Sequence, residues 1–198
     1  MQVSVIIATY GSEDWRDLAM SRAYPSCIDQ GAHEIIVGHD EDATIAQVRN
    51  ALADKTSGDW LCFLDADDEL APGYVDAMAQ VGGVDVLLTP SVQKVRNGRV
   101  SEPTFYKEIP LNVANWLVVG TLVRRELFMR VGGFSDYPHG FEDWSLWAKC
   151  WKAGARPVRV PKAVYIQHVN PQSKHRVGWR NRKWQVATHE RVQKDLFG

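Results

Sequence analysis

The sequence predicts an α/β fold built on an open, mostly parallel sheet. Apolar, strand-like segments alternate with helix-like segments from the N-terminus to Thr89, and polar side chains follow three of the strands where they end. This alternation implies parallel pairing through right-handed crossovers. Because ligands of such sheets gather at the carboxyl ends of the strands, we expect a binding site at that edge.

Four strands separated by three helices are predicted in the first half. β-Branched and apolar runs predict the strands, which span residues 3–8, 34–37, 60–64 and 84–89. Helical spacing of apolar residues, and a proline suited to a first turn, predict the helices, which span 13–23, 45–52 and 72–81. Thr9, Asp40 and the acidic run from Asp65 then follow three strand ends.

The second half is less regular. Asn97-Gly98 predicts a hairpin turn between strands at 91–95 and 99–100, and long irregular stretches follow. Glycines that stop helices predict two of them, at 124–130 before Gly132-Gly133 and at 142–153 before Gly154. Late strands are expected at 157–160 and 163–168, and a terminal helix at 179–197.

Composition indicates one globular domain over residues 1–198, of which 45% are hydrophobic. The formal net charge of -1 argues against a nucleic-acid binder that relies on bulk positive charge. Residues 174–198 hold seven basic and two acidic residues, a local charge of 7 - 2 = +5. A solvated helix face explains this segment most simply; contact with donor phosphates, an anionic membrane or nucleic acid is the alternative.

The chain is expected to be soluble and cytoplasmic. Its three cysteines are widely spaced and odd in number, which favours a reducing compartment over a disulfide framework or a zinc cluster. No basic signal-peptide region precedes the first apolar run, and no apolar stretch approaches the ~20 residues of a membrane span.

Carboxylates are concentrated at the end of the third strand, in Asp65-Ala66-Asp67-Asp68. Hard oxygen ligands held this close suit Mn²⁺ or Mg²⁺ bridging a diphosphate. Without a cation or a basic partner the cluster would repel itself. The alternative is a solvated acidic turn that caps the helix after Pro72.

Several motifs in order resemble those of the family 2 glycosyltransferases of the GT-A fold. Asn50 stands eight residues before Gly58 and fifteen before Asp65, which is the family spacing. The other matching segments are residues 3–10, 34–37, 63–68, 131–134, 142–144 and 146–147. The resemblance covers most of the chain and implies a nucleotide-sugar-binding half at 1–95, an acceptor-side half at 96–170 and a basic tail at 171–198.

The resemblance also implies an activity, the inverting transfer of a sugar from a nucleoside diphosphate donor, expected to be a UDP-sugar, to an acceptor hydroxyl. Asp143 would be the general base, and the metal would stabilise the leaving diphosphate. The donor would be bound by Thr9, Tyr10, Asp40, Asn50, Asp65 and Ala66, and the metal by Asp65, Asp67 and His168. His175 is the second histidine candidate.

Asp143 and Glu142 occupy the first turn of a helix whose apolar stripe consists of Trp144, Trp147, Ala148 and Trp151. The stripe is expected to pack the helix against the core; the alternative for Trp144 is that one edge of its ring is exposed. The helix dipole would favour an ionised Asp143 and lower its basicity; complementing the dipole is the alternative role for both acids. The chain departs from the family pattern at Gly38-His39-Asp40, where only one of two usual aspartates is kept.

Three other functions share some of these sequence features. A haloacid-dehalogenase-like phosphohydrolase also places Asp-x-Asp after a strand, but usually after the first one. A sugar nucleotidyltransferase would need a glycine-rich basic loop near the start, which residues 8–12 do not supply. A non-catalytic sugar-nucleotide-binding module would not need Asp143 beside an intact Asp65-Ala66-Asp67.

Overall fold

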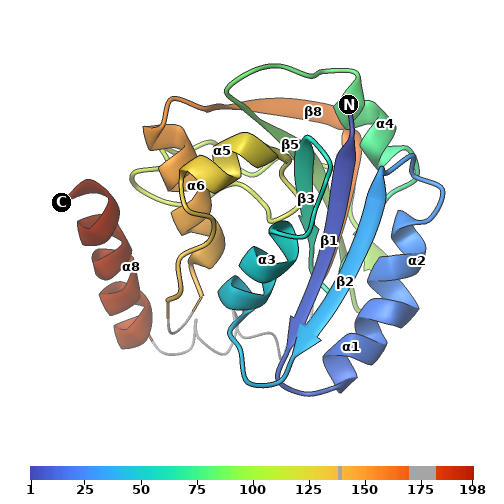
Figure 1. Ribbon diagram of the computed structural model, residues 1–198, viewed down its shortest axis with the longest axis horizontal. Helices are drawn as coiled ribbons and strands as arrows, with labels where there is room; N and C mark the ends of the chain where they lie inside the picture. Colours follow the sequence, from blue (N-terminus) through green and yellow to red (C-terminus); the bar gives the residue numbers. More distant parts are fainter. Residues whose placement is uncertain (138–139, 170–181) are drawn as a thin grey trace.

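A computed structural model describes residues 1–137, 140–169 and 182–198, in which strands and helices form the layered α/β arrangement of Figure 1. The first sheet has the order β2-β1-β3-β7. Its strands are β1 (Val3–Tyr10), β2 (Glu34–Asp40), β3 (Trp60–Leu64) and β7 (Val123–Arg124). β1 pairs in parallel with both β2 and β3, as predicted, whereas β7 runs antiparallel to β3.

The helices of the first half flank this sheet (Figure 1). They are α1 (Asp14–Leu18), the π-helix η1 (Ala19–Ala23), α2 (Tyr24–Cys27), α3 (Ile45–Ala53) and α4 (Tyr74–Ala79). The predicted first helix therefore continues further, with a π-turn that ends two residues before Pro25, which has no N–H to donate into the helix. α3 begins at a capping box in which Thr44 and Gln47 exchange side-chain and backbone hydrogen bonds.

A second sheet has the order β4-β8-β5-β6. Its strands are β4 (Glu69–Leu70), β5 (Val86–Arg96), β6 (Arg99–Val100) and β8 (Arg156–His168). The expectation that the fourth apolar strand continues the parallel sheet is wrong, since β5 pairs in parallel with β8 and β7 lies beside β3 instead. Two residues of β7 carry too little pattern to be predicted from the sequence.

β8 corrects a second expectation, because the two predicted late strands are one strand with a register shift. Pro90 pairs with Val160 and the next residue, Ser91, pairs with Val164. The Ser91 Oγ lies 3.2 Å from the carbonyls of both Pro161 and Ala163, so its one proton is shared between them and holds the bulged residues in place. The hairpin turn at Asn97-Gly98 is confirmed, with φ of 50° and 74°.

The remaining helices are α5 (Arg125–Arg130), α6 (Glu142–Lys152) and α8 (Arg182–Phe197). The terminal helix was predicted from Trp179, which lies outside the described residues. Residues 101–122 hold no strand or helix, as expected. None of the helices in the described part of the chain is long and apolar enough to cross a membrane.

Most buried apolar side chains form one cluster around β1 and β3, and it includes Trp147 of α6. A smaller cluster joins α6 to α8 through Tyr137, Trp144, Ala148 and Val192. The prediction that the apolar stripe of α6 packs into the core is thus confirmed for Trp144, Trp147 and Ala148. The alternative that Trp144 has an exposed edge is wrong, because its side chain is 1% exposed. The three cysteines are buried and unbonded.

Candidate active site

The acidic turn after β3 brings three carboxylates together. Oxygens of Asp65, Asp67 and Asp68 lie within 4.8 Å of one another, and the Asp68 N–H donates to the Asp65 carbonyl at 3.1 Å to close the turn. Burial, followed by the neighbouring Asp65 carboxylate, raises the pKa of Asp67 to about 6. The turn therefore gathers more negative charge than its surroundings neutralise, which suits a bound cation.

Asp68 connects this turn to β8. Its carboxylate accepts hydrogen bonds from the Tyr165 hydroxyl at 2.8 Å and from the His168 backbone N–H at 2.7 Å. The side chain is buried, and burial together with Asp65 and Asp67 raises its pKa. Asp68 thus fixes the end of β8, and with it His168, beside the acidic turn.

His168, the predicted third metal ligand, shares a cavity of about 360 Å³ with Asp67. Arg22 and the hairpin residues Asn97 and Gly98 line the same cavity. The His168 Nε2 lies 2.5 Å from Glu69 Oε1, so the imidazole now has a carboxylate partner of its own. His175 lies outside the described residues.

Arg49 is a site residue that the sequence analysis missed. From α3 its guanidinium contacts Asp65 Oδ1 at 2.6 Å and Glu142 Oε1 at 2.9 Å, and the residue is only 4% exposed. Burial opposes its charge, but the surrounding carboxylates outweigh burial and raise its pKa. Its position, four residues after Ile45 and three before Leu52, was the available signal, because a cation on an apolar helix face needs a buried partner.

Asp143 lies at the start of α6, beside the Arg49–Glu142 pair. Its Oδ2 accepts from the Asn115 side chain at 2.9 Å and its Oδ1 from the Trp144 N–H at 2.7 Å. The side chain is half-buried, and burial, then Glu142, raise its pKa to about 7. Burial therefore acts on this carboxyl in the opposite sense to the helix dipole, which favours the ionised form.

α6 is held in place by its tryptophans. Trp147 lies in the main core, and the indole N–H of Trp144 donates to the Leu111 carbonyl at 2.7 Å. Phe141, directly before the helix, has a φ of 69°, a left-handed conformation uncommon for a bulky residue. The first turn of α6, which carries Glu142 and Asp143, is therefore held in position by the buried side chains of Trp144 and Trp147.

The ends of β1 and β2 bring Thr9, Tyr10 and Asp40 close together, with Tyr10 paired to Asp40 in register. Thr9 Oγ1 lies 2.9 Å from His39 Nδ1. Asp40 is exposed, and its Oδ1 accepts from the N–H groups of Asp42 and Ala43 at 3.0 and 3.1 Å. The histidine that replaces the first family aspartate is thus the partner of Thr9.

Asn50 and Ala66 complete the predicted set. The Asn50 amide donates to the Phe134 carbonyl and accepts from the Phe134 N–H, both at 2.9 Å, so it joins α3 to the loop after α5. Ala66 is 7% exposed within the acidic turn. Asn50 therefore faces the later half of the chain, while Ala66 separates the two first carboxylates.

One family model matches the sequence, that of glycosyl transferase family 2, over residues 30–81. The match runs from before β2 to the end of α4 and includes Asp40, Asn50 and Asp65 to Asp67. It confirms the family resemblance for this segment; Asp143 lies beyond it. No protein with a curated description matches the sequence.

Solved structures of similar fold include Staphylococcus aureus TarS, at 20% identity and a TM-score of 0.59, covering 87% of this chain and 37% of TarS. Residues 1–349 of TarS in complex with UDP-GlcNAc match at 17% identity and a TM-score of 0.58, covering 88% and 60%. GalNAc-T7 with UDP, GalNAc and Mn²⁺ matches at 13% identity and a TM-score of 0.62, covering 86% and 44%. The chain spans less than two thirds of each neighbour. The predicted GT-A fold is confirmed.

Proposed function

Because the chain carries a segment of the family 2 glycosyltransferases on a GT-A fold, we propose that it transfers a sugar from a UDP-sugar to an acceptor hydroxyl. One observation carries the proposal. Arg49 joins Asp65 of the acidic turn to Glu142, the neighbour of Asp143, through contacts of 2.6 and 2.9 Å. The candidate metal motif and the candidate base thus belong to one charged network.

The acidic turn has the donor chemistry for Mn²⁺ or Mg²⁺. Asp65 and Asp67 supply hard carboxylate oxygens, and His168 faces Asp67 across one cavity. When bound, the ion acts as a Lewis acid that stabilises the leaving diphosphate. GalNAc-T7, a neighbour in fold, was crystallised with UDP, GalNAc and Mn²⁺, which supports this part of the proposal.

Donor binding is proposed for the strand ends and the acidic turn, at Thr9, Tyr10, Asp40, Asn50, Asp65 and Ala66. These residues belong to the half of the chain at 1–95, and the acceptor would contact the half at 96–170. The complex of TarS with UDP-GlcNAc supports a uridine donor.

Asp143 is proposed to remove the proton from the acceptor hydroxyl. A general base works best with a pKa near the working pH, and burial raises the pKa of Asp143 to about 7. The amide of Asn115 fixes the carboxylate through its 2.9 Å hydrogen bond. A single base without a carboxylate nucleophile implies inversion at the anomeric carbon.

The test is a thermal-shift screen of nucleoside diphosphates with Mn²⁺ or with a chelator, using wild type and Asp67→Ala. A ligand at 100 times its Kd stabilises the native state by about 2.7 kcal/mol. UDP should raise the melting temperature more with Mn²⁺, and Asp67→Ala should abolish the difference. Equal stabilisation of metal-free protein in chelator would rule out the metal bridge.

Catalysis needs its own measurement, because a binding module would pass the thermal test. Incubation with the responding donor and candidate acceptors should yield a product whose anomeric proton, seen by NMR, shows the inverted configuration. A retained configuration would discard Asp143 as the sole base. Nucleotide binding with neither transfer nor donor hydrolysis would favour the non-catalytic module.

A further inference from the structure

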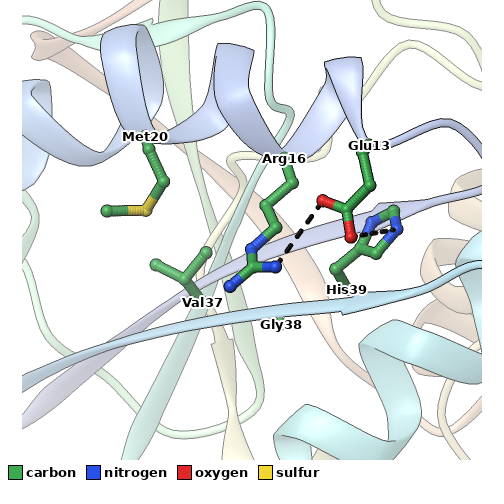
Figure 2. Close-up of a pocket in the computed structure, with 6 residues that line it drawn as sticks. All are labelled: Glu13, Arg16, Met20, Val37, Gly38 and His39. Carbon is green, nitrogen blue, oxygen red and sulfur yellow. Dashed lines mark ion pairs between the residues drawn. The ribbon is translucent and has the colours of Figure 1, made fainter.

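A second group of metal-ligating side chains lies at the ends of β1 and β2, outside the acidic turn. Donor atoms of Glu13, His39 and Glu41 lie within 4.8 Å of one another. Figure 2 shows the Glu13 side chain pointing toward the His39 ring, and both residues line a cavity of about 360 Å³ together with Arg16 and Met20. None of the residues proposed to hold Mn²⁺ belongs to this group.

The hydrogen bonds of Thr9 determine which nitrogen of the neutral His39 ring carries the proton. The Thr9 hydroxyl lies 3.3 Å from the Gly38 carbonyl, to which it donates, and 2.9 Å from His39 Nδ1. A hydroxyl has a single proton, so both contacts are satisfied only when Nδ1–H donates to Thr9 Oγ1. In the neutral ring the other nitrogen, Nε2, is then unprotonated and carries a lone pair.

That lone pair has no partner among the described residues. The His39 side chain is only 9% exposed, and its Nε2 is buried without a hydrogen bond. The nearest charged oxygen is Glu13 Oε1 at 4.0 Å, an acceptor like Nε2 itself. Two acceptors that face each other repel, and a cation between them would replace the repulsion with two bonds.

The exposed carboxylates of Glu13 and Glu41 can complete such a site. Glu13 is 53% exposed, and its other oxygen, Oε2, pairs with Arg16 at 3.5 Å, which leaves Oε1 directed toward His39. Glu41 is exposed. Small rotations of these two side chains would bring all three donors to the ~2.0–2.2 Å that Zn²⁺ requires, without moving the backbone.

We propose that Glu13, His39 and Glu41 bind a divalent transition metal ion, for which Zn²⁺ serves as the probe. One neutral imidazole and two carboxylates are ligands that Zn²⁺ accepts, as other divalent transition metal ions do. Thr9 acts as the outer partner that fixes the ring nitrogen for the metal. The bound ion ties the segment before α1 to the end of β2, and the site does not depend on glycosyl transfer.

Zinc titration of metal-free protein by calorimetry tests the proposal. The background is Asp67→Ala, which disables the acidic turn. This protein should bind one equivalent of Zn²⁺. His39→Gln or Glu13→Gln should weaken binding by more than ~100-fold, since loss of an outer partner alone costs roughly 10–100-fold, the effect expected of Thr9→Val. His33→Gln is the control, because His33 directly precedes the start of β2, whereas His39 lies near its end, and the His33 Nε2 bonds to Ser57 at 3.1 Å.

NMR of nitrogen-labelled protein adds a direct readout, in which Zn²⁺ should shift the His39 Nε2 resonance and leave His33 unchanged. Zinc binding that survives His39→Gln and Glu13→Gln, or disappears in Asp67→Ala alone, overturns the proposal. Glu13 is half-exposed, so Glu13→Gln decides the matter even if the His39 variant fails to fold.

Discussion

The buried environment of Asp143 affects both the stability of the protein and the pH at which this residue can act as a base. Burial and Glu142 raise the pKa of its carboxyl to about 7, whereas an unfolded chain would show about 3.9. The folded state therefore binds the proton more tightly. The stability from this group is fully present below the unfolded pKa and is lost as pH rises through about 7, the range in which the base becomes active.

Asp143→Asn should lower transfer by ~10²–10⁴-fold, because an amide cannot accept the proton. Nucleotide affinity should persist, since the donor residues are elsewhere. The wild-type rate should rise as pH passes about 7 and the variant's residual rate should not. At pH 8 the variant should be at least as stable as wild type, as measured by urea unfolding.

Glu142→Gln is the control for Asp143→Asn. It lies one residue away and leaves the Asp143 carboxylate in place, so it should reduce transfer less. A larger loss in Glu142→Gln would transfer the base role to Glu142. Near-normal transfer by Asp143→Asn would remove Asp143 from catalysis.

Arg49 is expected to matter for stability more than any exposed cation. Arg49→Met leaves the carboxylates of Asp65 and Glu142 without their buried partner; because Asp65 is 41% exposed, the cost should lie at or below the ~3–5 kcal/mol of a fully buried pair. The matched control is Arg130→Met, whose pair with Asp85 at 3.6 Å is more than half exposed and is worth ~0–1 kcal/mol. Urea unfolding of both variants measures the difference, and equal losses would contradict the buried network.

The part of the candidate site that could be predicted from the sequence is the acidic turn, because all of its residues belong to one short motif. Asp65, Ala66 and Asp67 follow a buried strand directly, so their place at the sheet edge follows from local pattern. Arg49 contacts residues 16 and 93 positions away, and Asn115 belongs to an irregular stretch. Such contacts arise from tertiary packing, which periodicity does not encode.

Among the elements, the loop after α5 depends on two consecutive glycines with φ of 76° and 58°. A Cβ at Gly132 would meet nothing within 4 Å, whereas one at Gly133 would lie 2.4 Å from Asn50 Oδ1. That oxygen accepts the Phe134 N–H, so the side chain cannot withdraw without breaking the link between α3 and this loop.

Gly132→Ala should therefore cost only the left-handed strain of about 1–2 kcal/mol. Gly133→Ala should cost about 1–3 kcal/mol more, because it also leaves buried polar groups unpaired. Paired denaturant curves of the two variants make the comparison. If both lose the same stability, the Asn50 link contributes nothing to the fold.

Element prediction succeeded where burial is local and failed where pairing is distant. β1 and β3 are buried apolar runs, which local sequence pattern is enough to predict. The Asn97-Gly98 pair likewise predicts its hairpin turn without information from the rest of the chain. The partner of β5 was missed because β8 lies some 70 positions further along the chain, as in the pairing of Val86 with Arg156. Strand neighbours of that separation are chosen by the whole sheet and not by the strand.

For the whole molecule, α8 is expected to support the candidate site from outside. Val192 is fully buried against the α6 cluster, and the rings of Trp144 and His189 stack at 4.7 Å. Val192→Asp should cost about 2 kcal/mol or more by removing an apolar contact and burying a charge. Transfer should fall as well, because Trp144 adjoins Asp143.

Val186→Asp is the control, since Val186 is 47% exposed on the same helix. Its stability should stay within about 0.5 kcal/mol of wild type. Thermal unfolding and a transfer assay on both variants separate the cases. Equal behaviour of the two variants would show that α8 does not support α6.

The hydrogen bonds that Asp68 accepts from Tyr165 and His168 have a consequence for synthesis on the ribosome. The two partners lie 97 and 100 positions later in the chain. At about 5–20 residues per second, translation needs roughly 5–20 s to pass from the acidic turn to the strand that holds it. During that interval the nascent chain carries the complete motif on an unsupported loop, and a premature termination before Tyr165 would release a polypeptide with every acidic ligand of the turn and no site.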